Sequence, residues 1–358
     1  MLTGSLMMGG RLGAALVGVL STLIGRVHGG PAQVGVLSST LFGGVSGSAV
    51  ADASAIGSLL IPWHKRLGYP PAFSAATLAA AATIDILIPP SIPMILFALT
   101  ANASIAALFV AGILPGILMC VGFMFMCWWV GKRRNFPRDT TPINWSEFRV
   151  HLLYSSPALL LPVLIVLFLR FGIATPTEVA VLSTLYAAAV SVVVYRDLSL
   201  KRLNDAVVHA GLATGVVLLV IMASAAIGWL LTYDQMPTGV AHWIQQNVSQ
   251  GWIVILIMNL LMLFIGMFID LPAAVLLLTP VFLPLAESIG MDPVQLGIMM
   301  VVNLAVGLYT PPVGTTLFIT SALAKVKVGQ TVRELGPFYF VAFLVLALVS
   351  YVPASILR

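Results

Sequence analysis

Apolar runs follow one another along almost the whole chain, and short polar, glycine-rich or proline-rich stretches separate them. The runs at 105–130, 152–169 and 206–231 are close to the ~20 residues that a helix needs to cross the hydrocarbon core of a bilayer. None of them alternates between apolar and polar residues as a β-strand does, so helices satisfy the backbone groups. The pattern predicts an all-α polytopic membrane protein.

A group of shorter runs predicts a re-entrant helical hairpin, which enters and leaves the membrane on one side. Pro31 to Val45 and Ala49 to Ile61 are apolar, and Ser46-Gly47-Ser48 separates them. At roughly 1.5 Å per residue, neither piece crosses the membrane alone. The next run, 72–101, is long enough to cross, but its prolines from Pro89 onward remove backbone donors. It therefore predicts a broken transmembrane helix.

The same arrangement recurs near the C-terminus, which indicates an internal repeat. A shift of 222 residues (251 − 29 = 222) places Gly29 on Gly251 and Pro89-Pro90 on Pro311-Pro312. The second hairpin is predicted at 252–283 and the second broken helix at 293–323. We divide the chain into a partial N-terminal segment (1–28), a first inverted repeat (29–130), central linking spans (131–250) and a second inverted repeat (251–358).

The basic residues predict that the two repeats are inverted relative to each other in the membrane. Lys132, Arg133 and Arg134 mark one loop as cytoplasmic, and counting spans from it places Lys65 and Lys325 on the same side. The stretch 232–250 has no Lys or Arg, and it falls on the far side. The first hairpin then opens from the cytoplasm and the second from the far side, an arrangement on which alternating access is commonly built.

The composition agrees with a membrane protein. Of the 358 residues, 60% are hydrophobic and 8% are charged, and the mean hydropathy is +1.07. A soluble domain carries about 25% charged residues, so this chain cannot cover itself with a polar surface. The net charge of +5 comes from basic residues in short loops between apolar runs, which indicates membrane topology and not nucleic-acid binding.

The hairpin tips and helix breaks are the candidate binding site. Broken helices place free N–H groups, which attract carboxylates, and free C=O groups, which bind Na⁺, inside the protein. The candidates for binding substrate and Na⁺ are Ser46, Gly47, Ser48, Pro89, Pro90, Ser91, Gly266, Asp270, Asn303, Thr310, Pro311, Pro312 and Gly314. The alternative is that the small residues among them only let helices approach closely.

Three carboxylates lie within apolar runs, where a charged side chain is costly and is by default a functional hypothesis. Asp270 borders the second hairpin tip, and the 222-residue shift places it on Ser48, so we favour it as a site residue. Asp52 follows Ser48 by one helical turn and either caps that half-helix or binds a ligand. Asp85 is an added cation ligand, a proton carrier or a residue wetted by a cavity. Asn303 either holds the unwound backbone or binds directly.

Several motifs, in one order, resemble the large membrane subunit of tripartite ATP-independent periplasmic (TRAP) transporters of the dicarboxylate type. They are Ser46–Pro62, Gly68–Pro71, Ile88–Pro93, Ala111–Gly116, Gly172–Glu178 and Asn303–Gly314. The resemblance implies an elevator fold like that of the ion-transporter superfamily, with a moving domain that holds both hairpins. It also implies a cation-coupled importer of organic acids that works with a small membrane subunit and a periplasmic binding protein.

The chain departs from the pattern of that family at two places. Family members usually begin with further membrane helices, so we expect this chain to lack its N-terminal helices. Asp85-Ile86 also stands where family members usually read Gly-Pro, just before Ile88-Pro89-Pro90-Ser91. The second departure bears on the first cation site.

We therefore expect a permease subunit in the bacterial inner (cytoplasmic) membrane, in contact with lipid, that imports a C4-dicarboxylate or similar organic acid with Na⁺. We expect no cofactor besides this coupling ion, no nucleic-acid partner and no enzyme activity, because no catalytic triad, metal-ligand spacing or phosphate loop is seen. One alternative is a self-sufficient Na⁺/carboxylate symporter or antiporter. Another is a truncated assembly scaffold that does not transport.

Overall fold

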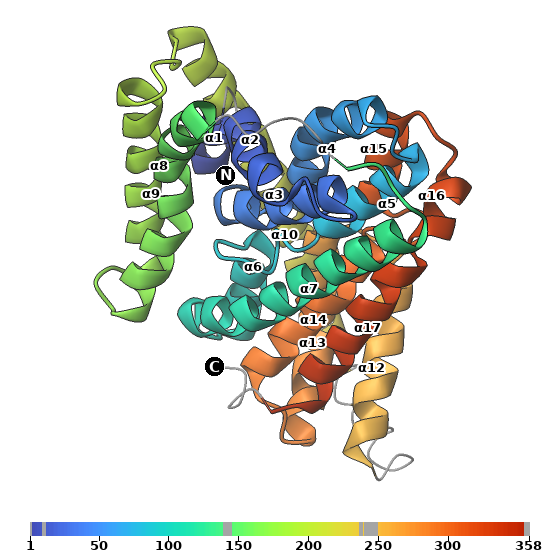
Figure 1. The fold of residues 1–358 in the computed structure, drawn as a ribbon. Helices are drawn as coiled ribbons and strands as arrows, with labels where there is room; N and C mark the ends of the chain where they lie inside the picture. The colour runs from blue at the N-terminus through green and yellow to red at the C-terminus, as the bar shows by residue number, and fades with distance from the viewer. Residues whose placement is uncertain (1, 9–11, 139–144, 236–238, 240–249, 354–358) are drawn as a thin grey trace.

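The structure, a computed structural model, describes residues 2–8, 12–138, 145–235, 239 and 250–353 (Figure 1). Within these ranges the chain is helical and contains no β-strand, as the apolar runs predicted. In chain order the helices are α1 (Leu2–Met8), α2 (Leu12–Ile24), α3 (Gly30–Ser46), α4 (Ala49–Arg66), α5 (Pro71–Ala81), α6 (Ile92–Ala101), α7 (Ile105–Arg133), α8 (Trp145–Arg170), α9 (Pro176–Val193), α10 (Leu200–Tyr233), α12 (Gly251–Gly266), α13 (Leu271–Ser288), α14 (Pro293–Gly307), α15 (Thr315–Ala324), α16 (Val328–Glu334) and α17 (Gly336–Tyr351).

Five of the described helices are long and apolar enough to cross a membrane, namely α7, α8, α9, α10 and α13. The pair α16 and α17, bent by 58°, makes a sixth span when it is taken together. The second arms of the two hairpins are longer than we expected, because α4 and α13 have 18 residues each. α4 continues through Pro62 to Arg66, where we expected it to end at Ile61.

The helix boundaries repeat with the same shift as the sequence. α4 and α13 begin and end 222 residues apart (271 − 49 = 222; 288 − 66 = 222). α5 and α14 begin at Pro71 and Pro293, again 222 apart, and α15 begins one residue later than the shift from α6 predicts. The Pro89–Pro90 and Pro311–Pro312 peptide bonds are both cis. Each copy thus has two hairpin helices followed by two helices that flank a break.

The first break is longer than its prolines predict. α5 ends at Ala81, well before them, and residues 82–90 form a run of turns and bends. Pro90 has no N–H, so it leaves the carbonyl of Ile86 without a helical donor. The Ser91 hydroxyl donates to that carbonyl oxygen instead, at 2.6 Å. The unwound segment carries Asp85 to the tip of the first hairpin.

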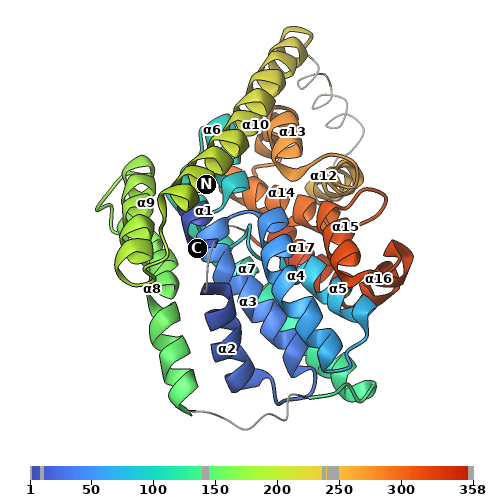
Figure 2. The same cartoon turned by 90° about the horizontal axis from the view of Figure 1, so that it is seen from above.

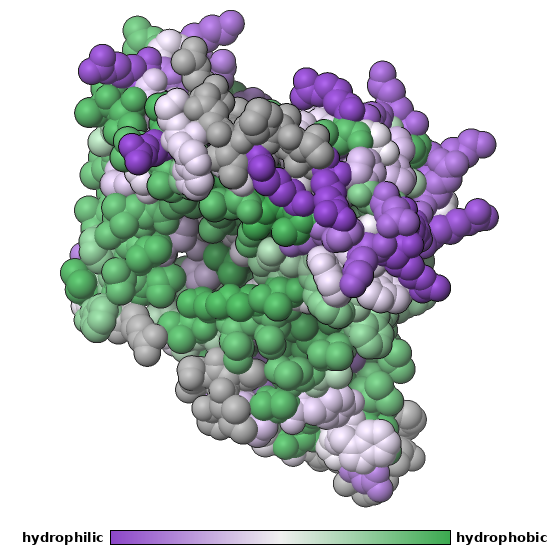
Figure 3. Space-filling model, in the orientation of Figure 1, coloured by the Kyte–Doolittle hydropathy of each residue, from purple (hydrophilic) through white to green (hydrophobic). Residues whose placement is uncertain are grey.

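Loops that the basic residues assigned to the cytoplasm meet at one end of the molecule. The Lys65 ammonium donates to the Ala324 carbonyl at the end of α15 (2.7 Å), and the Arg134 guanidinium pairs with the Glu334 carboxylate (2.7 Å). The first contact joins the two copies, and the second joins the start of the central section to the second copy. Hydrophilic side chains gather near the ends of α4, α5 and α16, whereas α12 extends away from that end (Figure 1 and Figure 3).

Two helices of the central section, α8 and α9, stand side by side at one flank of the molecule (Figure 2). The capping box predicted at the start of α9 is confirmed. The Thr175 N–H donates to the Glu178 carboxylate (2.7 Å), and the Thr175 hydroxyl accepts from the Glu178 N–H (3.4 Å).

The flank formed by α8 and α9 has an apolar outer surface. Leu153, Leu185 and Val193 are among its exposed large apolar side chains. Such a surface suits lipid or another membrane protein.

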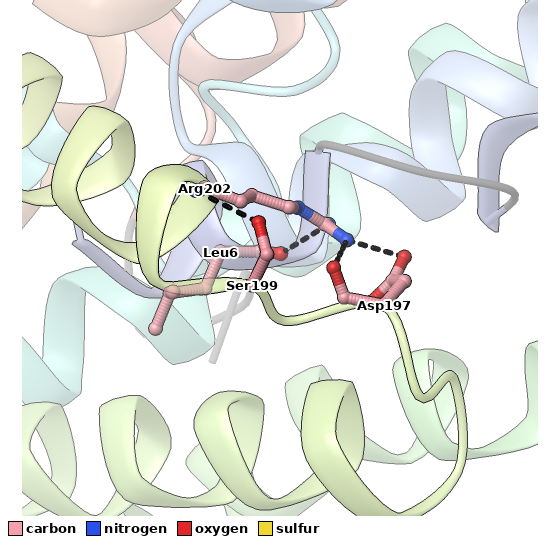
Figure 4. Close-up of polar contacts among 4 residues, drawn as sticks. All are labelled: Leu6, Asp197, Ser199 and Arg202. Atoms are coloured by element: carbon pink, nitrogen blue, oxygen red, sulfur yellow. Dashed lines mark hydrogen bonds and ion pairs between the residues drawn. The ribbon is translucent and has the colours of Figure 1, made fainter.

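The start of α10 is tied to the N-terminal helix α1 (Figure 4). The Arg202 guanidinium donates to the Leu6 carbonyl at 2.9 Å and to the Asp197 carbonyl at 3.2 Å, and it forms an ion pair with the Asp197 carboxylate. The Arg202 N–H donates to the Ser199 hydroxyl at 3.2 Å. From this anchor α10 runs along α13, which brings it to the hairpin tips.

Candidate functional site

The first hairpin turns at Gly47, between α3 and α4. Gly47 has φ +64°, in the left-handed region that glycine adopts without steric cost. A β-carbon added to it would lie 2.4 Å from the Pro90 carbonyl oxygen. Both the turn and the contact therefore require glycine, and the first tip touches the first break.

Asp85 holds this tip from the break. Its Oδ1 accepts from the Gly47 N–H and its Oδ2 from the Ser48 N–H, both at 3.0 Å. The Ser48 amide belongs to the N-cap of α4, where the helix dipole favours a carboxylate, whereas the Gly47 amide ends α3 and also donates to the Gly43 carbonyl (3.2 Å). Asp85 is fully buried, so the interpretation that a cavity wets it is wrong. Its observed role is to fasten the hairpin to the break, while a role toward a cation stays a prediction.

The second hairpin turns just before Asp270, between α12 and α13. Asp270 is the N-cap residue of α13, and its side chain is exposed. The tip contacts the second break through the Val313 N–H, which donates to the Met267 carbonyl at 3.2 Å. Each tip is thus hydrogen-bonded to its own break, through a side chain in the first copy and through backbone in the second.

A cavity of about 370 Å³ opens between the two tips. Gly47 and Ser48 reach it from the first hairpin, and Asp270 reaches it from the second. Its full lining is Gly47, Ser48, Ala49, Val50, Ile86, Ile92, Pro93, Ala213, Val216, Val217, Asp270, Leu271, Pro272 and Leu308. The structure thus brings three predicted site residues from the two copies to one cavity, and α10 forms part of its wall.

A second cavity, of about 20 Å³, lies beside the second tip. Gly266, Asp270 and Gly314 line it, together with Thr315. The Thr315 hydroxyl oxygen is buried and has no hydrogen-bond partner among the described residues. A space of about 10–15 Å³ is enough for one water molecule, so this cavity suits one small ion or one water. Asp270 lines both cavities.

Comparison with known proteins identifies the family. The chain matches the family model described as "Tripartite ATP-independent periplasmic transporter, DctM component" over residues 1–355. The chain belongs to this family. Its members are transport proteins and not enzymes, so the chain is a multi-pass permease of the inner membrane. The family that the motifs predicted is confirmed.

Individual relatives support this membership. The chain is 58% identical to "Uncharacterized protein y4mL" of Sinorhizobium fredii over 354 residues. This match covers 99% of this chain and 84% of that protein. It is 35% identical to the "C4-dicarboxylate TRAP transporter large permease protein DctM" of Pseudomonas aeruginosa, over 99% of this chain and 83% of that protein. The solved structure of the Alcanivorax borkumensis YdaH transporter shares the fold, with a TM-score of 0.64 at 19% identity, over 98% of this chain and 84% of that chain.

Asn303 and Thr310 of this DctM-family permease donate hydrogen bonds to other residues of the fold, and a direct contact of either with substrate or Na⁺ stays a prediction. The Asn303 amide donates to the backbone and side-chain oxygens of Asn259 (2.9 and 2.8 Å), which ties α14 to α12. The prediction that Asn303 holds unwound backbone is wrong, because Asn259 lies within a helix. The Thr310 hydroxyl donates to the Val306 carbonyl one turn earlier (2.6 Å).

Asp52 and Ser91 are also buried away from the two cavities. Asp52 lies in the first turn of α4, but its carboxylate oxygens accept no hydrogen bond from the amides there. Asp85 takes the amides at that end instead, so the interpretation of Asp52 as a cap is wrong. The Ser91 hydroxyl accepts from the Met94 N–H at the start of α6 (3.4 Å). Ser46 and Pro90 line a further cavity, of about 130 Å³, together with residues of α8 and α9.

Sequence reasoning missed the two threonines that follow Gly314. Thr315 lines the small cavity, and the Thr316 hydroxyl donates to the Ala79 carbonyl of the first copy (3.1 Å) and to the Leu308 carbonyl (2.9 Å). Their position directly after a predicted break was the available signal. The contribution of α10 to the larger cavity had no local signal, because it depends on how a distant helix crosses the tips.

Proposed function

We propose that this chain is the permease subunit that imports an organic acid by Na⁺-coupled secondary transport, together with a small membrane subunit and a periplasmic binding protein. The observation that carries the proposal is the cavity between the hairpin tips. The N-terminus of α13 begins at Leu271 on its wall and suits a carboxylate. Asp270 beside it suits a cation. Substrate and coupling ion would then bind next to each other.

The small cavity beside the second tip supports the cation part of the proposal. Na⁺ is a hard ion, and the oxygens of Asp270 and Thr315 are ligands of the type that hard cations prefer. A buried hydroxyl oxygen without a partner calls for an explanation such as an ion or a water, and Thr315 has such an oxygen. Gly266, at the end of α12, adds a helix C-terminus, which also favours a cation.

Contacts between the copies support movement of both hairpins as one body. Thr316 joins α15 to α5 at Ala79, and Lys65 joins α4 to the end of α15 at Ala324. The Phe73 ring packs against the Phe338 ring, with centroids 6.0 Å apart. A body held together in this way is suited to carry the cavity across the membrane as an elevator does.

The test is uptake into proteoliposomes that contain the permease and its small membrane subunit. A labelled monocarboxylate and a labelled dicarboxylate are supplied under an inward Na⁺ gradient, with and without the periplasmic binding protein. We expect uptake of an organic acid that requires both the gradient and the binding protein. Uptake with Na⁺ alone would instead favour a self-sufficient symporter, and absence of any uptake would favour an assembly scaffold.

A further inference from the structure

The cavity between the hairpin tips has few groups that bind a second carboxylate. Of the described residues that line it, Asp270 has the one charged side chain, and none is Lys, Arg or His. Much of the lining is aliphatic, including Val50, Val216 and Leu308. With Na⁺ bound at Asp270 as proposed, a dianion in this cavity would still meet no basic side chain for its second carboxylate, and an unpaired charge removed from water is costly.

The backbone amides of the first tip are already occupied. Gly47 and Ser48 lie on the cavity wall, but their N–H groups donate to the two oxygens of Asp85 at 3.0 Å each. Asp85 is fully buried, next to Ile86 on the wall. A substrate carboxylate would have to displace Asp85 before it could use these two donors.

The second copy has no internal carboxylate in the equivalent place. The repeat shift sets Gly307 at the position of Asp85 (307 − 85 = 222), and the second tip is held by the backbone bond from Val313 to Met267. α13 begins at Leu271 on the cavity wall, and its N-terminus suits a single carboxylate. The two halves of the cavity therefore differ, because an internal acid fills the carboxylate position of the first half.

We infer that the permease takes an acid with one carboxylate and an apolar body, and that Asp85 determines this specificity by filling the position of a second carboxylate. The inference rests on the proposed function and narrows its substrate class. Asp85 acts from behind the cavity wall, so it determines specificity by occupying the amides of Gly47 and Ser48 and not by touching the substrate.

Two acids of equal chain length show the effect of a second carboxylate on binding. Pentanoate and pentanedioate differ in whether the far end is a methyl group or a carboxylate. Their dissociation constants are measured by titration calorimetry with excess Na⁺, on the permease purified with its small membrane subunit. The binding protein is left out, so its own selectivity does not enter. The variants are Asp85→Gly, which copies the second half, Asp85→Asn, and Asp205→Asn as a control that removes an exposed acid of α10.

We expect the unaltered permease to bind pentanoate at least about tenfold more tightly than pentanedioate, a ratio that corresponds to ~1.4 kcal/mol. Asp85→Gly removes the carboxylate from both amides, which then keep only their longer bonds within the tip, to the Gly43 carbonyl (3.2 Å) and the Ser46 hydroxyl (3.3 Å). It should reduce this ratio to less than about threefold, which is below ~0.7 kcal/mol. Asp85→Asn keeps one acceptor oxygen for the tip, so it should fold and reduce the ratio in part. Asp205→Asn should leave the ratio unchanged.

Other results would overturn the inference in distinguishable ways. Equal or tighter binding of pentanedioate by the unaltered permease contradicts the specificity and leaves organic-acid import intact. A ratio that both Asp85 variants leave unchanged removes Asp85 as its cause. Binding of neither acid, in a preparation that the uptake assay also shows to be inactive, overturns the proposed function and this inference with it.

Discussion

Gly307 lies so close to Gly266 that a β-carbon on residue 307 would come within 2.4 Å of the Gly266 carbonyl oxygen. The contact joins α14 to the end of α12, beside the second hairpin tip. Because the nearest atoms are backbone, Gly307→Ala must push the two helices apart. We expect this substitution to lower the free energy of unfolding by about 1–3 kcal/mol, as overpacking of a tight contact usually does. Thermal unfolding of the purified permease measures the effect.

The matched control for that substitution is Gly329→Ala. A β-carbon at residue 329 meets no heavy atom within 4 Å, and the residue lies in α16. We expect an unchanged or slightly higher unfolding temperature, because alanine is favoured over glycine in helices. Equal destabilisation by the two substitutions would show that the approach of α14 to α12 is not tight.

Thr315 and Thr316 are neighbours with different expected roles. Thr316→Val removes a buried donor from the Ala79 carbonyl, which should cost about 1–3 kcal/mol of stability. Thr315→Val removes a hydroxyl that has no partner among the described residues, so stability should be nearly unchanged. Sodium binding should weaken at Thr315→Val instead. Thermal unfolding and sodium titration of both variants separate the two effects.

The control for both threonines is Thr100→Val, because the Thr100 hydroxyl donates only within its own helix, to the Leu96 carbonyl (2.9 Å). It should change neither property much. Loss of stability at Thr315→Val with unchanged sodium binding would contradict the ion site beside the second tip.

The fold could be predicted from the sequence because its signals are local or repeated. Apolar runs give the helices, and the shift of 222 residues, read from turn and breaker residues, recurs in the boundaries of α4 and α13. The end of α5 at Ala81 could not be read in the same way. The unwound segment after it makes a local bond, from Ser91 to Ile86, and bonds between Asp85 and the hairpin tip, which form only when the chain has folded back. The assignment of domains stays a prediction.

The candidate site was predictable only in part. Glycines and small polar residues at the tips pointed to Gly47, Ser48 and Asp270, and these do line one cavity. Nothing local distinguished Asp85, which binds backbone amides, from Asp270, which faces the cavity. An intramembrane acid can be hydrogen-bonded by protein groups that are far away in the sequence. Such contacts decide the role of the acid, and a local sequence pattern does not show them.

The ion pair between Arg134 and Glu334 should contribute little to stability. The two side chains are 48% and 20% exposed, and exposed pairs are typically worth about 0.2–1 kcal/mol. Arg134→Gln should therefore lower the free energy of unfolding by less than about 1 kcal/mol, and the difference should shrink at high salt. A larger loss that persists in high salt would mean that this contact holds the central section to the second copy. Thermal unfolding at two salt concentrations provides the measurement.

Asp270 lines both cavities, and in the proposed site it is the cation ligand at their junction. The most direct measurement is binding of radioactive sodium to the permease, purified with its small membrane subunit, for the unaltered chain, Asp270→Asn and Asp234→Asn. Asp234 is an exposed acid just after α10 and serves as the control. We predict saturable binding that Asp270→Asn weakens at least about tenfold, or ~1.4 kcal/mol, with normal expression. Equal binding by all three chains would contradict the account.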